Sequence, residues 1–157
     1  MMLKKIVLGI SLIVLLGGCS KDKDCNFNEC GVVAPASEIT AVSNYLNSQS
    51  ITNAVQHCSG VFYVIENAGS GKRPDACSPV NVTYAGHLTN GTLFDQGTVD
   101  IGLYQVIRGW RTAIPQIREG GRIRIFIPPS LGYGQAPFGP IPGNSILVFT
   151  VDLHQVL

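Results

Sequence analysis

Residues 110–127 read WRTAIPQIREGGRIRIFI, and this stretch changes from a helical to a strand pattern. The pair Gly120-Gly121 separates the two patterns, and the isoleucines from Ile123 to Ile127 alternate as in a half-buried strand. Pro115 lies inside the helical part, where it removes one backbone hydrogen bond, so we expect the helix to bend or to begin late. The stretch predicts a helix of about two turns followed by a strand. The helical face carries Trp110, Ala113, Ile114 and Ile117, at spacings of three and four.

Further strand patterns lie on both sides of this helix. Residues 61–65 form a β-rich run, and Asn90-Gly91 is a strong hairpin signal between Leu88 and Phe94. We therefore expect an α+β fold, in which a mostly antiparallel sheet packs one short amphipathic helix against its apolar face. No repeat or second domain is visible. Alternation is clearest at Val80, Val82 and Tyr84 and again at Leu147, Phe149, Val151 and Leu153.

A second, N-terminal helix is predicted just before these strands. Ile39, Val42 and Leu46 share one helical face, and Ser37 is a plausible N-cap. The pattern covers about three turns at most, which is typical of a packing element or spacer.

The composition excludes several classes of protein. The chain has 157 residues, of which 45% are hydrophobic and 13% are charged, and its net charge is +1. Since no basic excess is present to neutralise phosphates, nucleic acid is not an expected partner. Aromatic and β-branched residues are spread along the chain, so the composition is not that of a disordered protein.

The N-terminal residues have the pattern of an export signal. Lys4 and Lys5 precede an apolar run from residue 6 to residue 16, which is too short to span a membrane. The run ends in Leu-Gly-Gly-Cys, which resembles a bacterial lipobox, so we expect a lipid on Cys19; an ordinary signal peptide is the alternative. The predicted organisation is a lipoprotein signal peptide over residues 1–18, a lipid-anchored tether and short helix over 19–59, and a folded domain over 60–157. The expected location is the bacterial cell envelope, on a membrane and facing the periplasm or the cell surface.

The remaining four cysteines are an even number, which in an exported chain indicates disulfides. Three pairings are open. We favour bonds between the tail and the domain, because these close longer loops. No Cys-x-x-Cys is present, and the spacing with His57 is not a usual zinc pattern. The candidates are Cys25, Cys30, Cys58 and Cys77.

The ordinary catalytic motifs are missing from the sequence. His57, His87 and His154 share no motif, and there is no nucleophile elbow, zinc-protease motif or dinucleotide fingerprint. If the chain is an enzyme, we expect a reaction that needs no metal, no cofactor and no strong acid or base.

Five blocks of sequence, in order, give the chain a specific resemblance to a known family. The blocks lie within residues 80–157, about half of the chain, and this region resembles the FKBP-type peptidyl-prolyl cis-trans isomerases. The family's twisted antiparallel sheet around one short helix agrees with the periodicity. The blocks are VTYAGHL (82–88), NGTLFD (90–95), QVIRGW (105–110), IPPSLGYG (127–134) and IPGNSILVF (141–149).

The resemblance implies an apolar pocket and a role for each of its residues. The Trp110 indole would be the floor, and the Ile107 N–H and the Tyr133 hydroxyl would donate to a substrate carbonyl. Asp95 would organise the polar rim through Tyr84. Val99 and Ile101 stand where the family usually has phenylalanines, so one aromatic wall is missing. The implied set is Tyr84, Phe94, Asp95, Val106, Ile107, Trp110, Tyr133, Ile141 and Phe149.

The implied activity is rotation about X–Pro bonds in exported proteins. The implied partners are proline-containing unfolded polypeptides and macrolide inhibitors, and the reaction needs no proton transfer. Two alternatives remain open: a non-catalytic chaperone built on the same fold, and an accessory lipoprotein of a surface machine.

Overall fold

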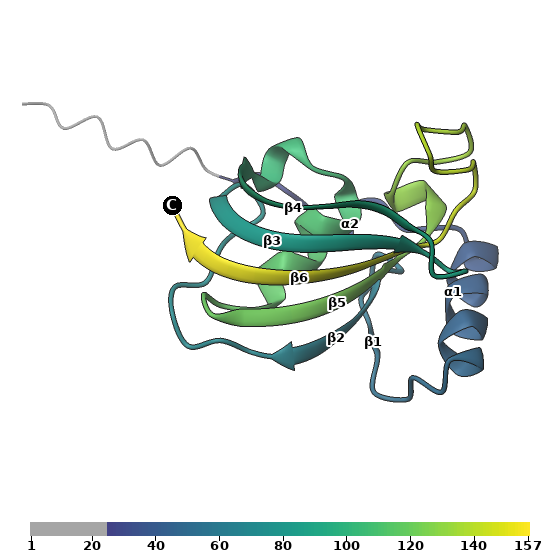
Figure 1. Cartoon of the computed structure of the whole chain (residues 1–157), viewed down its shortest axis with the longest axis horizontal. Helices are drawn as coiled ribbons and strands as arrows, with labels where there is room; N and C mark the ends of the chain where they lie inside the picture. Colours follow the sequence, from purple (N-terminus) through teal and green to yellow (C-terminus); the bar gives the residue numbers. More distant parts are fainter. Residues whose placement is uncertain (1–24) are drawn as a thin grey trace, which may run out of the picture.

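The computed structural model describes residues 25–157 and places them in a twisted six-stranded antiparallel sheet with a helix on each face (Figure 1). The predicted α+β class is confirmed. The signal peptide, the lipid site Cys19 and the start of the tether lie outside the described residues. The helices are α1 (Ala36–Ser48) and α2 (Arg108–Ala113). The strands are β1 (Val55–Gln56), β2 (Phe62–Asn67), β3 (Pro79–Leu88), β4 (Leu93–Gly102), β5 (Gly121–Ile127) and β6 (Leu147–Val156).

The strands follow the order β1-β2-β5-β6-β3-β4, and every neighbouring pair is antiparallel. The predicted turn at Asn90-Gly91 joins β3 to β4. Gly91 has a φ of 86°, which a side chain would strain, and the Thr92 N–H donates to Asn90 Oδ1 at 3.0 Å. After the turn the register shifts between His87 and Gly86, and this shift brings Gly86 of β3 opposite Asp95 of β4.

Helix α2 packs on the face of the sheet that holds the larger core. All four residues of its predicted apolar face are buried, together with the alternating residues of β5 and β6. Pro115 has a different effect from the predicted bend or late start. The α-helix ends at Ala113, and a 3₁₀ turn over Ile114–Gln116 accommodates the proline. The helix that positions the site is therefore only six residues long.

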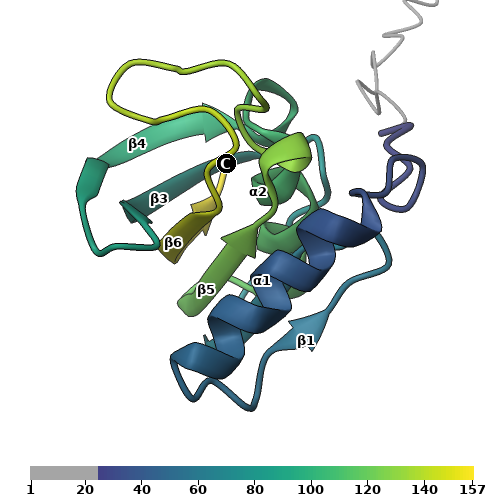
Figure 2. The same ribbon diagram turned by 90° about the vertical axis from the view of Figure 1, so that its right-hand side faces the viewer.

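Helix α1 packs on part of the opposite face of the sheet, at β2 and the end of β5, and Figure 2 shows it close to β5 and β1. Val42 and Leu46 are buried there against Phe62, Val64 and Phe126. The predicted N-cap at Ser37 is wrong, because the helix already begins at Ala36 with Pro35 as its N-cap and no side-chain cap.

The predicted domain boundary at residue 60 stays a prediction. In the structure, β1 precedes this boundary and pairs with β2, so residues on both sides contribute to one sheet. Among the described residues, no helix is long and apolar enough to cross a membrane.

The four cysteines lie in two pairs, and each pair joins the N-terminal segment to the region of the sheet. Cys25 lies beside Cys77 and Cys30 beside Cys58, with Cα atoms 5.7 and 5.6 Å apart. These separations fit disulfide geometry. Of the three pairings left open by the sequence, this is one of the two that attach the tail to the domain.

Candidate active site

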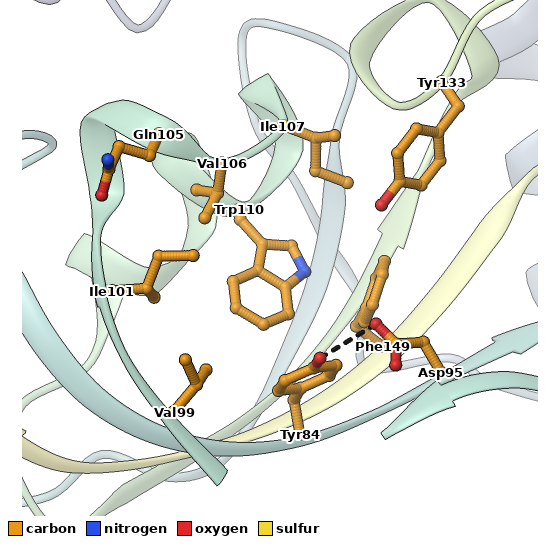
Figure 3. A pocket seen from close by; sticks show the side chains of 10 residues that line it. All are labelled: Tyr84, Asp95, Val99, Ile101, Gln105, Val106, Ile107, Trp110, Tyr133 and Phe149. Carbon is orange, nitrogen blue, oxygen red and sulfur yellow. Dashed lines mark hydrogen bonds between the residues drawn. The ribbon is translucent and has the colours of Figure 1, made fainter. Parts of the chain in front are cut away.

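A cavity of about 290 Å³ opens between α2, the strands β3, β4 and β6, and the loop after β5 (Figure 3). Its lining side chains are far apart in the sequence, between residues 84 and 149. Seven of the nine predicted pocket residues line it. The complete lining is Tyr84, Asp95, Val99, Ile101, Gln105, Val106, Ile107, Trp110, Tyr133 and Phe149.

The floor of the cavity is the Trp110 indole, whose residue is only 5% exposed. The rings of Tyr84 and Phe149 meet it edge to face, each with its centroid 5.1 Å away. Aromatic pairs favour this geometry because the positive edge of one ring faces the negative face of the other. The three rings hold one another in place, so the floor has a defined orientation.

The polar rim is built across the β3–β4 hairpin. The Tyr84 hydroxyl donates a hydrogen bond of 2.9 Å to Asp95 Oδ2, which is the predicted contact (Figure 3). Burial raises the pKa of the Tyr84 phenol, and the Asp95 carboxylate raises it further. Burial, followed by the charge of Asp95, also raises the pKa of Tyr133. Both hydroxyls therefore keep their protons at neutral pH.

One backbone N–H group, that of Ile107, lies beside the cavity where the chain enters α2. Ile107 is the N-cap residue of this helix, and its carbonyl accepts from the N–H groups of Trp110 and Arg111 at 3.1 and 3.3 Å. Ile107 lies before the first residue of the helix, and within residues 25–157 its N–H donates no hydrogen bond to a loop, turn or cap carbonyl. A substrate carbonyl at the cavity would find this donor free.

Two predicted pocket residues do not line the cavity. Phe94 packs behind it, edge to face on Phe149 at 5.4 Å, and so supports a wall without forming one. Ile141 is buried in the core, and its backbone pairs with that of Phe138 in both directions at 2.9 Å. Its backbone closes the loop after β5, while its side chain packs in the core.

Three residues that line the cavity were not among the predicted site residues. Val99 and Ile101 alternate along β4, so they face the same side, where they form an aliphatic wall. The period-two spacing could have identified them. Gln105 has no such signal; its Oε1 accepts from the Gly102 N–H at 3.3 Å in the turn between β4 and α2.

A pair of stacked aromatic rings, one exposed and one partly buried, lies at the mouth of the cavity. Tyr133 stacks on Phe138 with centroids 4.5 Å apart and planes 8° from parallel. Phe138 remains 59% exposed, whereas the Tyr133 side chain points its hydroxyl into the cavity (Figure 3). The stack restricts the direction in which that hydroxyl donates.

The cavity offers binding and shape more than acid–base chemistry. Asp95 is its only carboxylate, and no histidine or cysteine lines it. Within the described residues, the groups with metal-ligand spacing are the two cysteine pairs with His57 and Asp75, and both lie outside the cavity.

The raised pKa values of the two phenols predict a specific response to alkaline pH. Tyr84 and Tyr133 should ionise only above the usual value of about 10. Because the folded pKa is raised, each neutral phenol contributes stability that is complete below about pH 10 and is lost as the pH rises through the folded pKa. Phenolate absorbance of the wild type, Tyr84→Phe and Tyr133→Phe measures this. Each variant should lack one late-ionising tyrosine; removal of an early-ionising one instead would contradict the assignment.

An antiparallel sheet wrapped around a short helix, with an aromatic cavity at that helix, defines a class of protein. Residues 71–154 match the family model of the FKBP-type peptidyl-prolyl cis-trans isomerases. The chain belongs to this family, so the resemblance seen in the sequence is confirmed.

Individual relatives agree with this membership. The chain is 39% identical over 103 residues to the FKBP-type peptidyl-prolyl cis-trans isomerase FkpA of Escherichia coli (strain K12), a match covering 62% of this chain and 38% of that one. A match to FkpA of Buchnera aphidicola (strain APS) has 34% identity over 116 residues and covers 71% and 48% of the two chains. The chain thus spans less than half the length of these curated relatives.

Solved structures support the same fold. The crystal structure of FkpA from Escherichia coli superposes with a TM-score of 0.69 at 33% identity, covering 77% of this chain and 60% of that one. A peptidyl-prolyl cis-trans isomerase from Pseudomonas syringae gives a TM-score of 0.68 at 29% identity, with 80% and 98% covered. The predicted FKBP-like fold is confirmed.

Proposed function

We propose that this protein is a peptidyl-prolyl cis-trans isomerase that assists the folding of exported proteins. The observation that carries the proposal is the cavity floored by Trp110, with the Ile107 N–H and the Tyr133 hydroxyl beside it. Its substrates are proline-containing unfolded or partly folded polypeptides.

Amide resonance sets the barrier to rotation about the X–Pro bond, and the site lowers this barrier by binding the twisted amide. Rotation about the X–Pro bond faces a barrier of about 18–20 kcal/mol and takes tens to hundreds of seconds unaided. The twisted transition state is less dipolar than the planar amide, so an apolar cavity binds it better than the ground state.

Each group of the site has a defined task in this mechanism. The proline ring lies on Trp110, while Phe149 limits how the ring can move. The Ile107 N–H and the Tyr133 hydroxyl donate to substrate carbonyls and hold the chain while the amide twists. The Tyr84–Asp95 hydrogen bond fixes the rim. No proton is transferred, which agrees with the single carboxylate in the cavity.

The direct test is cis/trans exchange of a short peptide with an apolar residue before proline, measured by NMR exchange spectroscopy. The exchange rate should rise in proportion to protein concentration. If folded, monodisperse protein gives no acceleration, the enzyme proposal fails. The remaining role would then be non-catalytic binding, which capture of unfolded polypeptides would examine.

We also propose that a lipid on Cys19 anchors the protein to a membrane of the bacterial cell envelope, facing the periplasm or the cell surface. The Leu-Gly-Gly-Cys motif supports this. A diacylglycerol mass on Cys19, and release into the soluble fraction by Cys19→Ser, are the expected results.

We propose that the cysteine pairs Cys25–Cys77 and Cys30–Cys58 are disulfides, which is supported by their Cα separations. Peptide mapping without reduction tests this.

We infer that macrolide inhibitors bind the cavity floored by Trp110, where they would contact the aliphatic wall of Val99 and Ile101. Because Trp110 is the sole tryptophan, its fluorescence reports their binding directly.

A further inference from the structure

The helix that carries the floor of the cavity has little stability of its own. Helix α2 has six residues, a glycine (Gly109) as its second residue and no side-chain cap at its N-terminus. Isolated helices of this length do not persist in water. Its position therefore depends on what packs against its two faces.

The inner face of α2 is in close contact with the sheet. At Gly109, a Cβ atom would lie 2.5 Å from the Ile127 side chain, so the helix backbone sits directly on β5. Trp110 and Ala113 are buried on the same side. This contact sets how near the helix lies to the sheet, but it leaves the outer face to be held by other groups.

The outer face of α2 is in contact with an aromatic ring from the N-terminal segment. Arg108 and Arg111 are three residues apart, so they lie on one side of the helix. The Phe27 ring lies beneath both guanidinium groups, with its centroid 4.9 Å from Arg108 Cζ and 4.1 Å from Arg111 Cζ. Neither arginine forms an ion pair with a carboxylate of residues 25–157, so the ring and nearby backbone carbonyls are the groups that face their charges there.

Phe27 is itself fixed on both sides. It lies between Cys25 and Cys30, whose partners Cys77 and Cys58 belong to the folded region. Arg111 connects α2 to the segment that holds Cys77. Its Nε donates to the Ala76 carbonyl at 2.9 Å, and its Nη2 lies 3.4 Å from Cys77 Sγ. The Arg108 guanidinium donates to the Asn28 carbonyl at 3.4 Å.

We propose that Phe27 is a positioning residue of the site. It clamps the first turn of α2 from outside and so fixes the Ile107 N–H and the Trp110 indole at the cavity. The inference rests on the proposed isomerase function for its kinetic consequence. Residue 27 lies outside the segment, 71–154, that matches the family model, so this clamp belongs to the chain's own N-terminal segment.

The test is Phe27→Ala in the full chain, with Phe27→Tyr as the conservative variant and Asn26→Ala as a matched control on the same segment. Loss of both cation–π contacts should lower kcat/KM about five-fold. The loss should fall on kcat more than on KM, because the substrate still enters the cavity but is held less well at the twisted state. Phe27→Tyr should restore the wild-type value, and Asn26→Ala should not change it.

A second readout separates this inference from the activity. Trp110 is the sole tryptophan, so intrinsic fluorescence reports the floor of the cavity alone. Phe27→Ala should shift its emission, and amides of α2 should exchange faster. If Phe27→Ala is folded with both cysteine pairs intact and keeps the wild-type emission and exchange, the clamp is refuted, whether or not the wild type is active. A wild type without isomerase activity but with the shifted emission would refute the enzyme proposal and keep the clamp.

Discussion

Trp110→Leu is expected to lower kcat/KM for a proline-containing peptide at least about ten-fold while the protein stays folded. The indole meets Tyr84 and Phe149 edge to face at 5.1 Å, and leucine provides neither contact. The contacts hold the floor in the orientation that fits the twisted amide, and a ten-fold loss corresponds to about 1.4 kcal/mol of transition-state stabilisation. Leucine is also smaller than the indole and would leave space under the substrate's proline ring. The proline ring would then be held less firmly while the amide twists. Peptide exchange rates for wild type and variant measure the effect.

The control for this substitution is Tyr104→Phe, because Tyr104 is an aromatic residue that is 59% exposed and lies outside the cavity lining. It should retain wild-type kcat/KM. Circular dichroism and thermal unfolding establish that Trp110→Leu is folded, since its fluorescence is lost with the indole. Full activity in the folded variant would place the reaction somewhere other than this cavity.

The periodicity of the sequence located the elements, because burial of one face leaves a period in the apolar residues. The alternation from Ile123 to Ile127 and the helical face of α2 are both buried as expected. The pattern could not reveal where the helix would end. Around Pro115 the last helical turn is a 3₁₀ turn, and the apolar spacing is the same for either kind of turn over so few residues.

The site was predicted less completely than the fold, for a geometric reason. Strand alternation says which side of the sheet a residue faces, but not whether its side chain reaches the cavity or another ring. Phe94 faces the correct side and yet ends behind Phe149. Gln105 lies in an irregular turn, where no period exists, and it was missed.

The N-terminal segment illustrates the same limit. It is polar and aperiodic, so the sequence predicted only a tether. In the structure its one aromatic residue, Phe27, packs on α2 through two arginines that are distant in the sequence. Single contacts of this kind leave no pattern along the chain. Strand β1 was missed for a related reason, because both of its residues are exposed.

Phe126→Ala is expected to lower the free energy of unfolding by about 3–5 kcal/mol, the range for removing a buried phenylalanine ring. Phe126 is 1% exposed and belongs to the buried cluster between α1 and the sheet. Its loss removes contacts of Val42, Leu46 and Tyr45 as well as its own burial. Urea unfolding followed by circular dichroism measures the difference.

The matched control is Phe138→Ala, which removes the same ring from a position that is 59% exposed and should cost less than about 1 kcal/mol. Both variants replace phenylalanine by alanine, so the difference between their unfolding free energies measures the effect of burial alone. A small loss for Phe126→Ala, close to that of the control, would mean that α1 is not packed on the sheet in solution. A large loss agrees with the packing of residues 36–48 on the sheet, and the N-terminal part of the chain then serves as a structural layer that also brings Phe27 to helix α2.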